Sequence, residues 1–109
     1  MISLGIDFGG TSIKFGVTDG GRIIFHGSPI ETQELSGADA ITQAIVGTIA
    51  AIRHNQPEIA AIGMGLPGIV DSVNGIVHEL SNVPGWNEVP LRQVIAEAPL
   101  SSCVSMGLP

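Results

Sequence analysis

The sequence predicts a mixed α/β sheet, built as a β-meander that leads into a β-α-β unit. Three observations support this fold class. Three short, β-rich apolar segments come first and are separated by glycine-containing turns. A segment with apolar residues at helical spacing follows, and another short apolar run comes directly after it. A strand, a helix and a strand in succession favour a parallel pair beside the antiparallel meander.

The meander is expected near the N-terminus. Residues 2–6 and 13–17 are short, apolar and rich in β-formers. The letters DGG at residues 19–21 are a strong turn signal, because glycine adopts the positive φ angles of tight hairpin turns. Residues 22–26, RIIFH, then predict a third strand that pairs with the second.

One helix is expected over residues 38–55. Ser36, followed by an acid three residues later, indicates its start as an acidic variant of the capping box. Its core-facing stripe consists of Ile41, Ala44, Ile45, Thr48, Ile49 and Ile52. Pro57 predicts its end, and the polar residues 28–37 before it are expected to form a loop.

The chain after this helix is expected to return to the sheet. Residues 59–65, IAAIGMG, form a short apolar run that predicts a buried strand parallel to the first one. Two short strands are expected at residues 69–71 and 76–78, with turn residues between them. Pro90 suits the first turn of a short helix that we expect to end near Glu97.

Composition limits the class of protein. The 109 residues suit one domain with a modest core, and 44% hydrophobic against 13% charged residues favours a packed chain. The net charge is −6 with four Lys and Arg residues, so the chain lacks the basic footprint of a nucleic-acid-binding protein. It also lacks the basic amphipathic face that holds a protein on an anionic membrane. Neither nucleic acid nor a membrane is expected as a partner.

The cellular compartment is suggested by cysteine usage and by the N-terminus. The lone Cys103 excludes an internal disulfide framework and suits a reducing compartment. The N-terminus has no basic region followed by an apolar stretch and a cleavage site, and no apolar run is long enough to span a bilayer. We therefore expect a cytoplasmic protein.

Two motifs that contain glycine are weak indicators of function. Residues 63–68, GMGLPG, match G-x-G-x-x-G, but a dinucleotide-binding fingerprint needs a helix to open at its last glycines. β-like residues follow here and Pro67 removes a backbone donor, so a glycine turn after a buried strand is favoured. The letters DFG at residues 7–9 match the metal motif of protein kinases, but the elements that precede it in those enzymes are missing.

The stretch LGIDFGGTSIKFGV near the N-terminus places an acid, two glycines and a hydroxyl between two apolar runs. Gly9 and Gly10 are expected to expose their backbone N–H groups and to let phosphate oxygens approach them, since no Cβ intervenes, and Thr11 adds a hydroxyl donor. Asp7 at the strand end can hold Mg²⁺ through water, and Lys14 can neutralise phosphate charge. A plain hairpin with a solvated Asp7 is the alternative that this spacing leaves open.

Three motifs together resemble a known family. GIDFGGTSIKFGV, residues 5–17, resembles the first phosphate motif of the superfamily of sugar kinases, actin and heat-shock ATPases. IGMGLPGIVD, residues 62–71, is similar to the sugar-side loop of the ROK family of bacterial sugar kinases and sugar-responsive repressors. NVPGW at residues 82–86, followed by VPL at 89–91, looks like that family's N-x-x-x-W and P-L segment. The motifs stand in family order, and the resemblance covers roughly residues 2–97.

The resemblance implies a ribonuclease-H-like fold of the actin and hexokinase type, present as a truncated N-terminal domain. Residues 1–97 would form this incomplete domain, and residues 98–109 would be a divergent tail. The implied activity is ATP-dependent 6-phosphorylation of a hexose, as in glucokinase, with ATP and Mg²⁺ as cofactors. The implied partners are a hexose or an N-acetylated amino sugar, and a homodimer is expected for a full-length form.

The resemblance also implies roles for individual residues. On the phosphate and Mg²⁺ side it implies Asp7, Gly9, Gly10 and Thr11, to which the spacing argument adds Lys14. On the sugar side it implies Gly65, Pro67, Gly68 and Asn82. Among these, Asp7 would hold the Mg²⁺ through water, and Asn82 would hydrogen-bond a sugar hydroxyl.

The chain departs from the family pattern at its C-terminal end. The family's catalytic base is an aspartate in a D-N-D-A-N-like segment, and residues 97–109 contain neither Asp nor Asn. We therefore assign no catalytic residue and expect little or no turnover by this chain alone, because a carboxylate accepts the proton of the attacking hydroxyl.

Two rival functions are considered beside a kinase fragment. One is the sugar-sensing domain of a ROK-type transcriptional repressor. Such repressors carry a helix-turn-helix before this domain, whereas this acidic chain begins directly at its first strand, which favours the kinase. The other is an unrelated α/β binding domain with chance glycine motifs.

Overall fold

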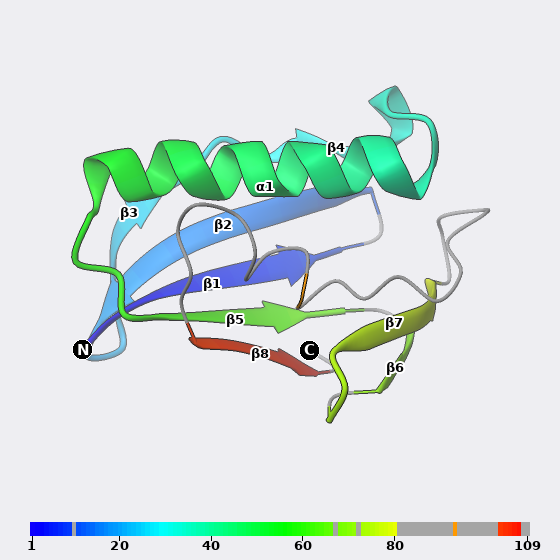
Figure 1. The fold of residues 1–109 in the computed structure, drawn as a ribbon. Helices are drawn as coiled ribbons and strands as arrows, with labels where there is room; N and C mark the ends of the chain where they lie inside the picture. The colour runs from blue at the N-terminus through cyan, green and yellow to red at the C-terminus, as the bar shows by residue number, and fades with distance from the viewer. Residues whose placement is uncertain (10, 67, 72, 81–92, 94–102, 108–109) are drawn as a thin grey trace.

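The computed structural model describes residues 1–9, 11–66, 68–71, 73–80, 93 and 103–107. In this part of the chain, one long helix covers one face of a six-stranded sheet with the strand order β3-β2-β1-β5-β8, and β4 pairs with β2 (Figure 1). A separate two-stranded hairpin, β6-β7, lies beyond the carboxyl end of β5. The mixed α/β sheet predicted from the sequence is confirmed.

The N-terminal meander consists of β1 (Ile2–Phe8), β2 (Ser12–Asp19) and β3 (Arg22–His26). Both pairings are antiparallel, and all three expected strands are present, the first two being longer than predicted. Gly20 and Gly21 join β2 to β3 with φ angles of 60° and 87°, as a tight hairpin turn requires.

The expected loop over residues 28–37 is partly wrong. It contains β4 (Ile30–Glu31) and a 3₁₀ turn, η1 (Thr32–Glu34). β4 pairs with the first two residues of β2, with Ser12 opposite Glu31. A two-residue strand has no periodic pattern of its own, so only its tertiary partner establishes it.

The helix α1 (Gly37–Asn55) matches the expected helix closely. The predicted capping box is wrong, because Ser36 makes no side-chain hydrogen bond to the helix start. Ser36 does stand directly before the helix, as predicted, but Gly37 has a φ of 84°, so the first residue of the helix lacks the regular geometry in which a side chain caps the helix. The helix ends where the N–H of Gln56 donates to the carbonyl of Ile52 at 2.8 Å, just before Pro57.

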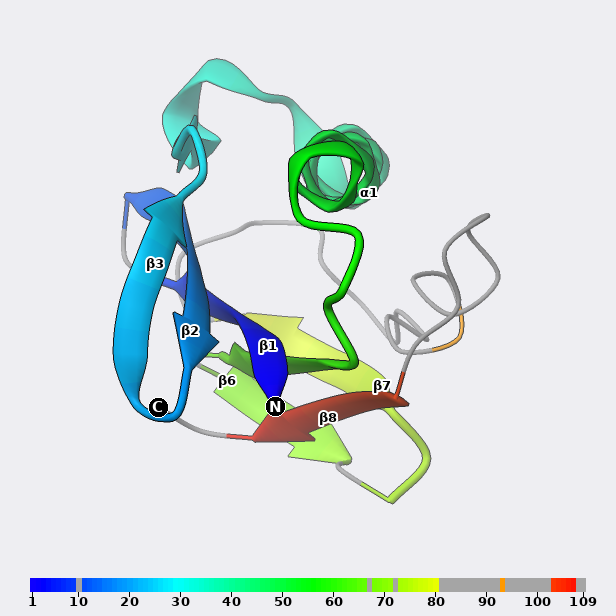
Figure 2. The ribbon, with the colours of Figure 1, turned by 90° about the vertical axis from the view of Figure 1, so that its left-hand side faces the viewer.

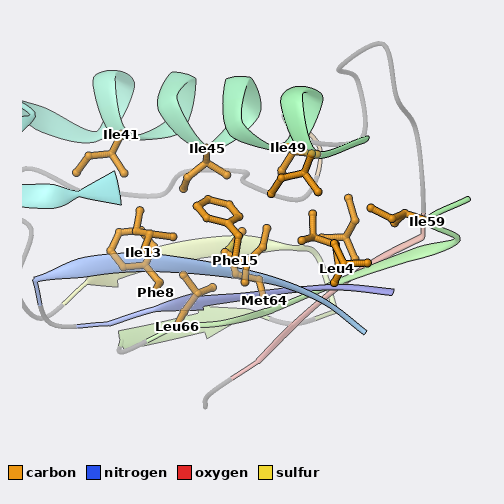
Figure 3. Close-up of a cluster of buried hydrophobic side chains, with 14 residues drawn as sticks. Leu4, Phe8, Ile13, Phe15, Ile41, Ile45, Ile49, Ile59, Met64 and Leu66 are labelled. Atoms are coloured by element: carbon orange, nitrogen blue, oxygen red, sulfur yellow. The ribbon is translucent and has the colours of Figure 1, made fainter. Parts of the chain in front are cut away.

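The core lies between α1 and the sheet (Figure 3). Side chains alternate along each strand, so every second residue of β1, β2 and β5 points to the helix. The strands and their flanks contribute Leu4, Ile6, Phe8, Ile13, Phe15, Val17, Ile59, Ile62, Met64 and Leu66. The helix contributes Ile41, Ile45, Ile49 and Ile52. Figure 2, which views α1 nearly along its axis, shows the helix on one side of the strands only.

β5 (Ala61–Gly65) runs parallel to β1, as predicted for the strand after the helix. β8 (Cys103–Gly107) pairs parallel to β5 on its other side. Five residues of the expected divergent tail therefore belong to the sheet. The boundary at residues 97 and 98 stays a prediction, because it lies outside the described residues.

The hairpin β6 (Gly68–Asp71) and β7 (Ile76–Leu80) confirms the two short strands expected after the glycine motif. The short helix expected over residues 90–97 lies outside the described residues except for Gln93, which is helical. No helix in the part of the chain that the structure describes is long and apolar enough to cross a membrane.

Candidate functional site

The face of the sheet opposite α1 gathers residues predicted for both sides of the site. Asp7 lies opposite Lys14 on β2 and opposite Gly65 on β5. These three residues form one row across the sheet, on the face that α1 does not cover, because their neighbours along each strand are buried in the core. Two residues expected near phosphate and one expected near sugar are therefore brought together.

The next row of the same face consists of glycines. Gly16, Gly5 and Gly63 lie side by side on β2, β1 and β5. Together the two rows form most of the floor of an open hollow of about 530 Å³, with Ile23 and His26 of β3 also among its lining residues. A floor without side chains leaves the backbone accessible beside the charged groups of the first row.

Asp7 and Lys14 are exposed side chains that line this hollow. Among the described residues, the amine of Met1 forms an ion pair with Asp19 at 3.9 Å, whereas neither Asp7 nor Lys14 has an ion-pair partner. One free carboxylate and one free ammonium therefore lie on neighbouring strands, where both can engage a ligand.

The turn that joins β1 to β2, residues 9–12, is closed by its own backbone. The N–H of Gly9 donates to the carbonyl of Ser12 at 2.8 Å. A Cβ on Gly9 would lie only 3.1 Å from that same oxygen, which explains the glycine. The expectation that Gly9 offers a free N–H to phosphate is therefore wrong, because that N–H closes the turn. Thr11 is exposed at the tip, and Gly10 lies outside the described residues.

Thr32, which lies in another segment of the chain, is hydrogen-bonded to this turn, and the sequence did not predict this contact. Its backbone N–H and its Oγ1 both donate to the carbonyl of Thr11, at 3.0 Å and 3.1 Å. No local pattern marks Thr32, because it is separated from Thr11 by 21 positions in a stretch that reads as a polar loop.

The turn and the glycine motif meet at one edge of the sheet. β1 and β5 are parallel, so their carboxyl ends lie together, which is where ligands bind in open α/β sheets. Gly65 ends β5, and Gly68 begins β6 as a strand, where a dinucleotide fingerprint would open a helix. Pro67 and Asn82 lie outside the described residues.

The donor set fits a magnesium nucleotide. Mg²⁺ keeps several of its waters and binds through one or two carboxylates plus phosphates, and the exposed Asp7 supplies one such carboxylate. The described residues contain no group of three side chains that would enclose a metal ion by themselves. The Lys14 ammonium and the exposed Thr11 hydroxyl are donors of the kind that phosphate oxygens accept.

Comparison with known proteins gives consistent matches along the chain. A model described as the ROK family matches residues 3–104. A glucokinase from Thermotoga maritima is 33% identical over 95 residues, which cover 86% of this chain and 29% of that protein. An N-acetyl-D-glucosamine kinase from Escherichia coli is 33% identical over 88 residues, covering 81% of this chain and 28% of that protein. The chain thus spans less than a third of the length of these relatives.

Solved structures agree with the fold. A ROK family glucokinase from Streptomyces griseus, in complex with glucose and AMPPNP, superimposes with a TM-score of 0.83 at 28% identity. The match covers 99% of this chain and 33% of that one. A ROK family transcriptional regulator, described as a homolog of the Escherichia coli MLC protein, gives a TM-score of 0.84 at 18% identity. This match covers 97% of this chain and 27% of the regulator, and at this identity it shows a similarity of fold alone.

These matches settle two of the sequence predictions. The ribonuclease-H-like fold of the actin and hexokinase type is confirmed. The hypothesis of an unrelated α/β domain with chance glycine motifs is wrong, since one family model spans nearly the whole chain.

Proposed function

Because the chain belongs to the ROK family, we propose that it forms the phosphate-binding part of an ATP-dependent hexose kinase. The proposed reaction is transfer of the γ-phosphoryl group of ATP to the 6-hydroxyl of a hexose, with Mg²⁺, as in glucokinase. The observation that carries this proposal is the row of Lys14, Asp7 and Gly65, which lies at the carboxyl ends of β1 and β5 and near the start of β2, beside the β1–β2 turn.

Each residue of the phosphate side has a defined task in this proposal. ATP with Mg²⁺ supplies the phosphoryl group when bound, and positioning and charge neutralisation provide most of the catalysis in such transfers. Asp7 holds the cation through water, and Lys14 offsets the negative charge of the phosphates. Thr11 donates its hydroxyl, and Gly9 and Gly10 leave room for phosphate oxygens beside the backbone.

The sugar side is proposed from the glycine motif. Gly65, Pro67 and Gly68 would border the sugar, and Asn82 would hydrogen-bond one of its hydroxyls. The relatives are named as kinases of glucose and of N-acetyl-D-glucosamine, so a hexose or an N-acetylated amino sugar is the proposed substrate class. A homodimer for a longer form and a cytoplasmic location belong to the same proposal.

Catalysis is a separate matter from binding. The 109 residues contain no D-N-D-A-N-like segment, and therefore no carboxylate in the position of the family's base. Without that proton acceptor we expect binding of nucleotide but little or no phosphorylation of glucose by these residues alone. Glucose phosphorylation at a rate proportional to the concentration of the purified 109-residue chain would contradict this expectation.

The sugar sensor of a ROK-type repressor is the alternative function. Its support is the fold likeness to a transcriptional regulator at 18% identity, whereas the kinases named above are 28% to 33% identical to this chain. Nucleotide binding separates the two functions, because a sensor of sugar alone has no need of a site for ATP.

The test is a calorimetric titration of the 109-residue chain with AMPPNP in the presence of Mg²⁺. We expect Asp7→Asn to weaken binding at least tenfold, because the variant loses the carboxylate that holds the cation. Asp19→Asn is the matched control, since Asp19 is another exposed acid but lies at the end of β2 that is far from Asp7 and the β1–β2 turn. Absence of binding by the unmodified chain, or an equal loss in both variants, would refute the proposal.

A further inference from the structure

One carbonyl in the β1–β2 turn is held by a single distant residue. The carbonyl of Thr11 accepts hydrogen bonds from both the N–H and the Oγ1 of Thr32, at 3.0 Å and 3.1 Å. Thr32 is buried, with 7% of its surface exposed, whereas Thr11 is exposed. The exposed tip of the turn is therefore tied to a buried side chain of another segment.

Thr32 is itself anchored on both sides. It follows β4, whose residue Glu31 pairs with Ser12 at the start of β2. Its own carbonyl accepts the N–H of Leu35 at 3.2 Å, and Leu35 packs against the hydrophobic core. The packing of Leu35 and the hydrogen bonds of Thr32 thus connect the core to the carbonyl of Thr11.

This arrangement restricts the turn at two points. The N–H of Gly9 is bound to the carbonyl of Ser12 at 2.8 Å, and the carbonyl of Thr11 is bound by Thr32. With both groups held, the peptide between Thr11 and Ser12 has little freedom to rotate. Donors that are already oriented before a ligand arrives lose less conformational entropy on binding, and so bind more tightly.

We propose that Thr32 is a positioning residue for the phosphate-binding turn, acting through the carbonyl of Thr11 without touching the nucleotide. This inference rests on the proposed function, which places the ATP phosphates at that turn. It assigns a role to a residue in the polar stretch before α1, which the sequence alone presents as a loop.

Thr32→Val tests the inference because valine keeps the shape of threonine and the backbone N–H bond, but removes the Oγ1 donor. Thr32→Ser keeps the hydroxyl and removes only a methyl group. Thr42 on α1 offers a matched control, since it is similarly buried at 6% exposed and its Oγ1 has no hydrogen-bond partner among the residues that the structure describes. Thr42→Val makes the same chemical change without removing a hydrogen bond.

The first measurement is the affinity of each variant for Mg²⁺-AMPPNP, by calorimetry on the 109-residue chain. We expect Thr32→Val to weaken binding about fivefold to tenfold, which is the size of one net hydrogen bond. Thr32→Ser and Thr42→Val should remain within about twofold of the unmodified chain. Equal affinity of Thr32→Val and the unmodified chain, or an equal loss in Thr42→Val, would overturn the inference.

The second measurement is hydrogen exchange of the Gly9 amide, whose N–H closes the turn. In Thr32→Val it should exchange about tenfold faster, while amides in the middle of β1 keep their rates, because only the turn is loosened. The serine variant should restore the slow rate. Uniform acceleration throughout β1 would instead indicate general destabilisation and would overturn the positioning role.

The two measurements separate the inference from the proposed function. If the unmodified chain binds no nucleotide, the proposed function fails, and exchange at Gly9 alone decides whether Thr32 orders the turn. If nucleotide binds and Thr32→Val changes neither affinity nor exchange, the proposed function stands and the role of Thr32 is refuted.

Discussion

The two turns at the ends of β2 both contain the sequence Gly-Gly, but Gly9 in one turn and Gly20 and Gly21 in the other are required for different physical reasons. The turn that joins β2 to β3 uses Gly20 and Gly21 at φ angles of 60° and 87°. Both have open space where a Cβ would be, so backbone conformation alone demands glycine there. The flanking Asp19 and Arg22 are exposed, and the ion pair that Asp19 forms with the amine of Met1 is long, at 3.9 Å, and exposed.

The turn that joins β1 to β2 is held by its surroundings instead. Phe8 and Ile13, which face each other at its base, are completely buried. Gly9 is required by contact, since a Cβ would lie 3.1 Å from the carbonyl oxygen of Ser12. A turn that rests on the core can keep an exposed donor such as Thr11 in place, whereas a free turn only connects two strands.

The largest expected effect is at the base of the first turn. Phe8→Ala removes a fully buried aromatic side chain and should lower the free energy of unfolding by about 3 to 5 kcal/mol. Arg22→Ala, at the base of the second turn, should change it by less than about 0.5 kcal/mol. Urea denaturation measures both, and a similar loss in the two variants would show that the turns do not differ in anchoring.

The next effect concerns the second turn. Gly21→Ala forces a side chain into a φ of 87° and should cost about 1 to 2 kcal/mol of stability, without changing nucleotide affinity. Gly47→Ala in α1 is the matched control, because its Cβ meets open space and alanine favours helix. That variant should be about 0.5 to 1 kcal/mol more stable in the same denaturation experiment. A loss of affinity in Gly21→Ala would place the second turn in the site.

Gly9→Ala should mainly lower nucleotide affinity and change stability little, in contrast to Gly21→Ala. Its new Cβ would crowd the carbonyl of Ser12, so the turn must widen by a few tenths of an ångström, and stability should fall by about 1 kcal/mol or less. Affinity for Mg²⁺-AMPPNP should fall about tenfold, because the methyl group occupies space proposed for phosphate oxygens. Titration calorimetry measures this, and an unchanged affinity would remove Gly9 from the proposed site.

The smallest expected effect is at the ion pair between Asp19 and the amine of Met1. Both groups are mostly exposed and 3.9 Å apart, so Asp19→Asn should alter the free energy of unfolding by at most a few tenths of a kcal/mol. Denaturation at low and high salt measures this contribution. A loss above about 1 kcal/mol would show that the second turn is anchored after all.

Much of the candidate site could be predicted, because its signals are local. Asp7 and Lys14 are identified by their positions around a glycine turn, and the structure places them in one row with Gly65. The free N–H expected at Gly9 was wrong, because a hydrogen bond across the turn uses it. A glycine in a sequence shows where the backbone is permissive, but does not show which partner its N–H finds.

The sequence by itself determined the meander, the helix and the parallel return strand, because alternation, helical spacing and the Asp-Gly-Gly turn act between near neighbours. Only the tertiary structure decided that β4 exists, that β8 joins the sheet and that Thr32 holds the carbonyl of Thr11. These features have no periodicity of their own. They arise because backbone groups far apart in the chain must find hydrogen-bond partners once the core has brought their strands together.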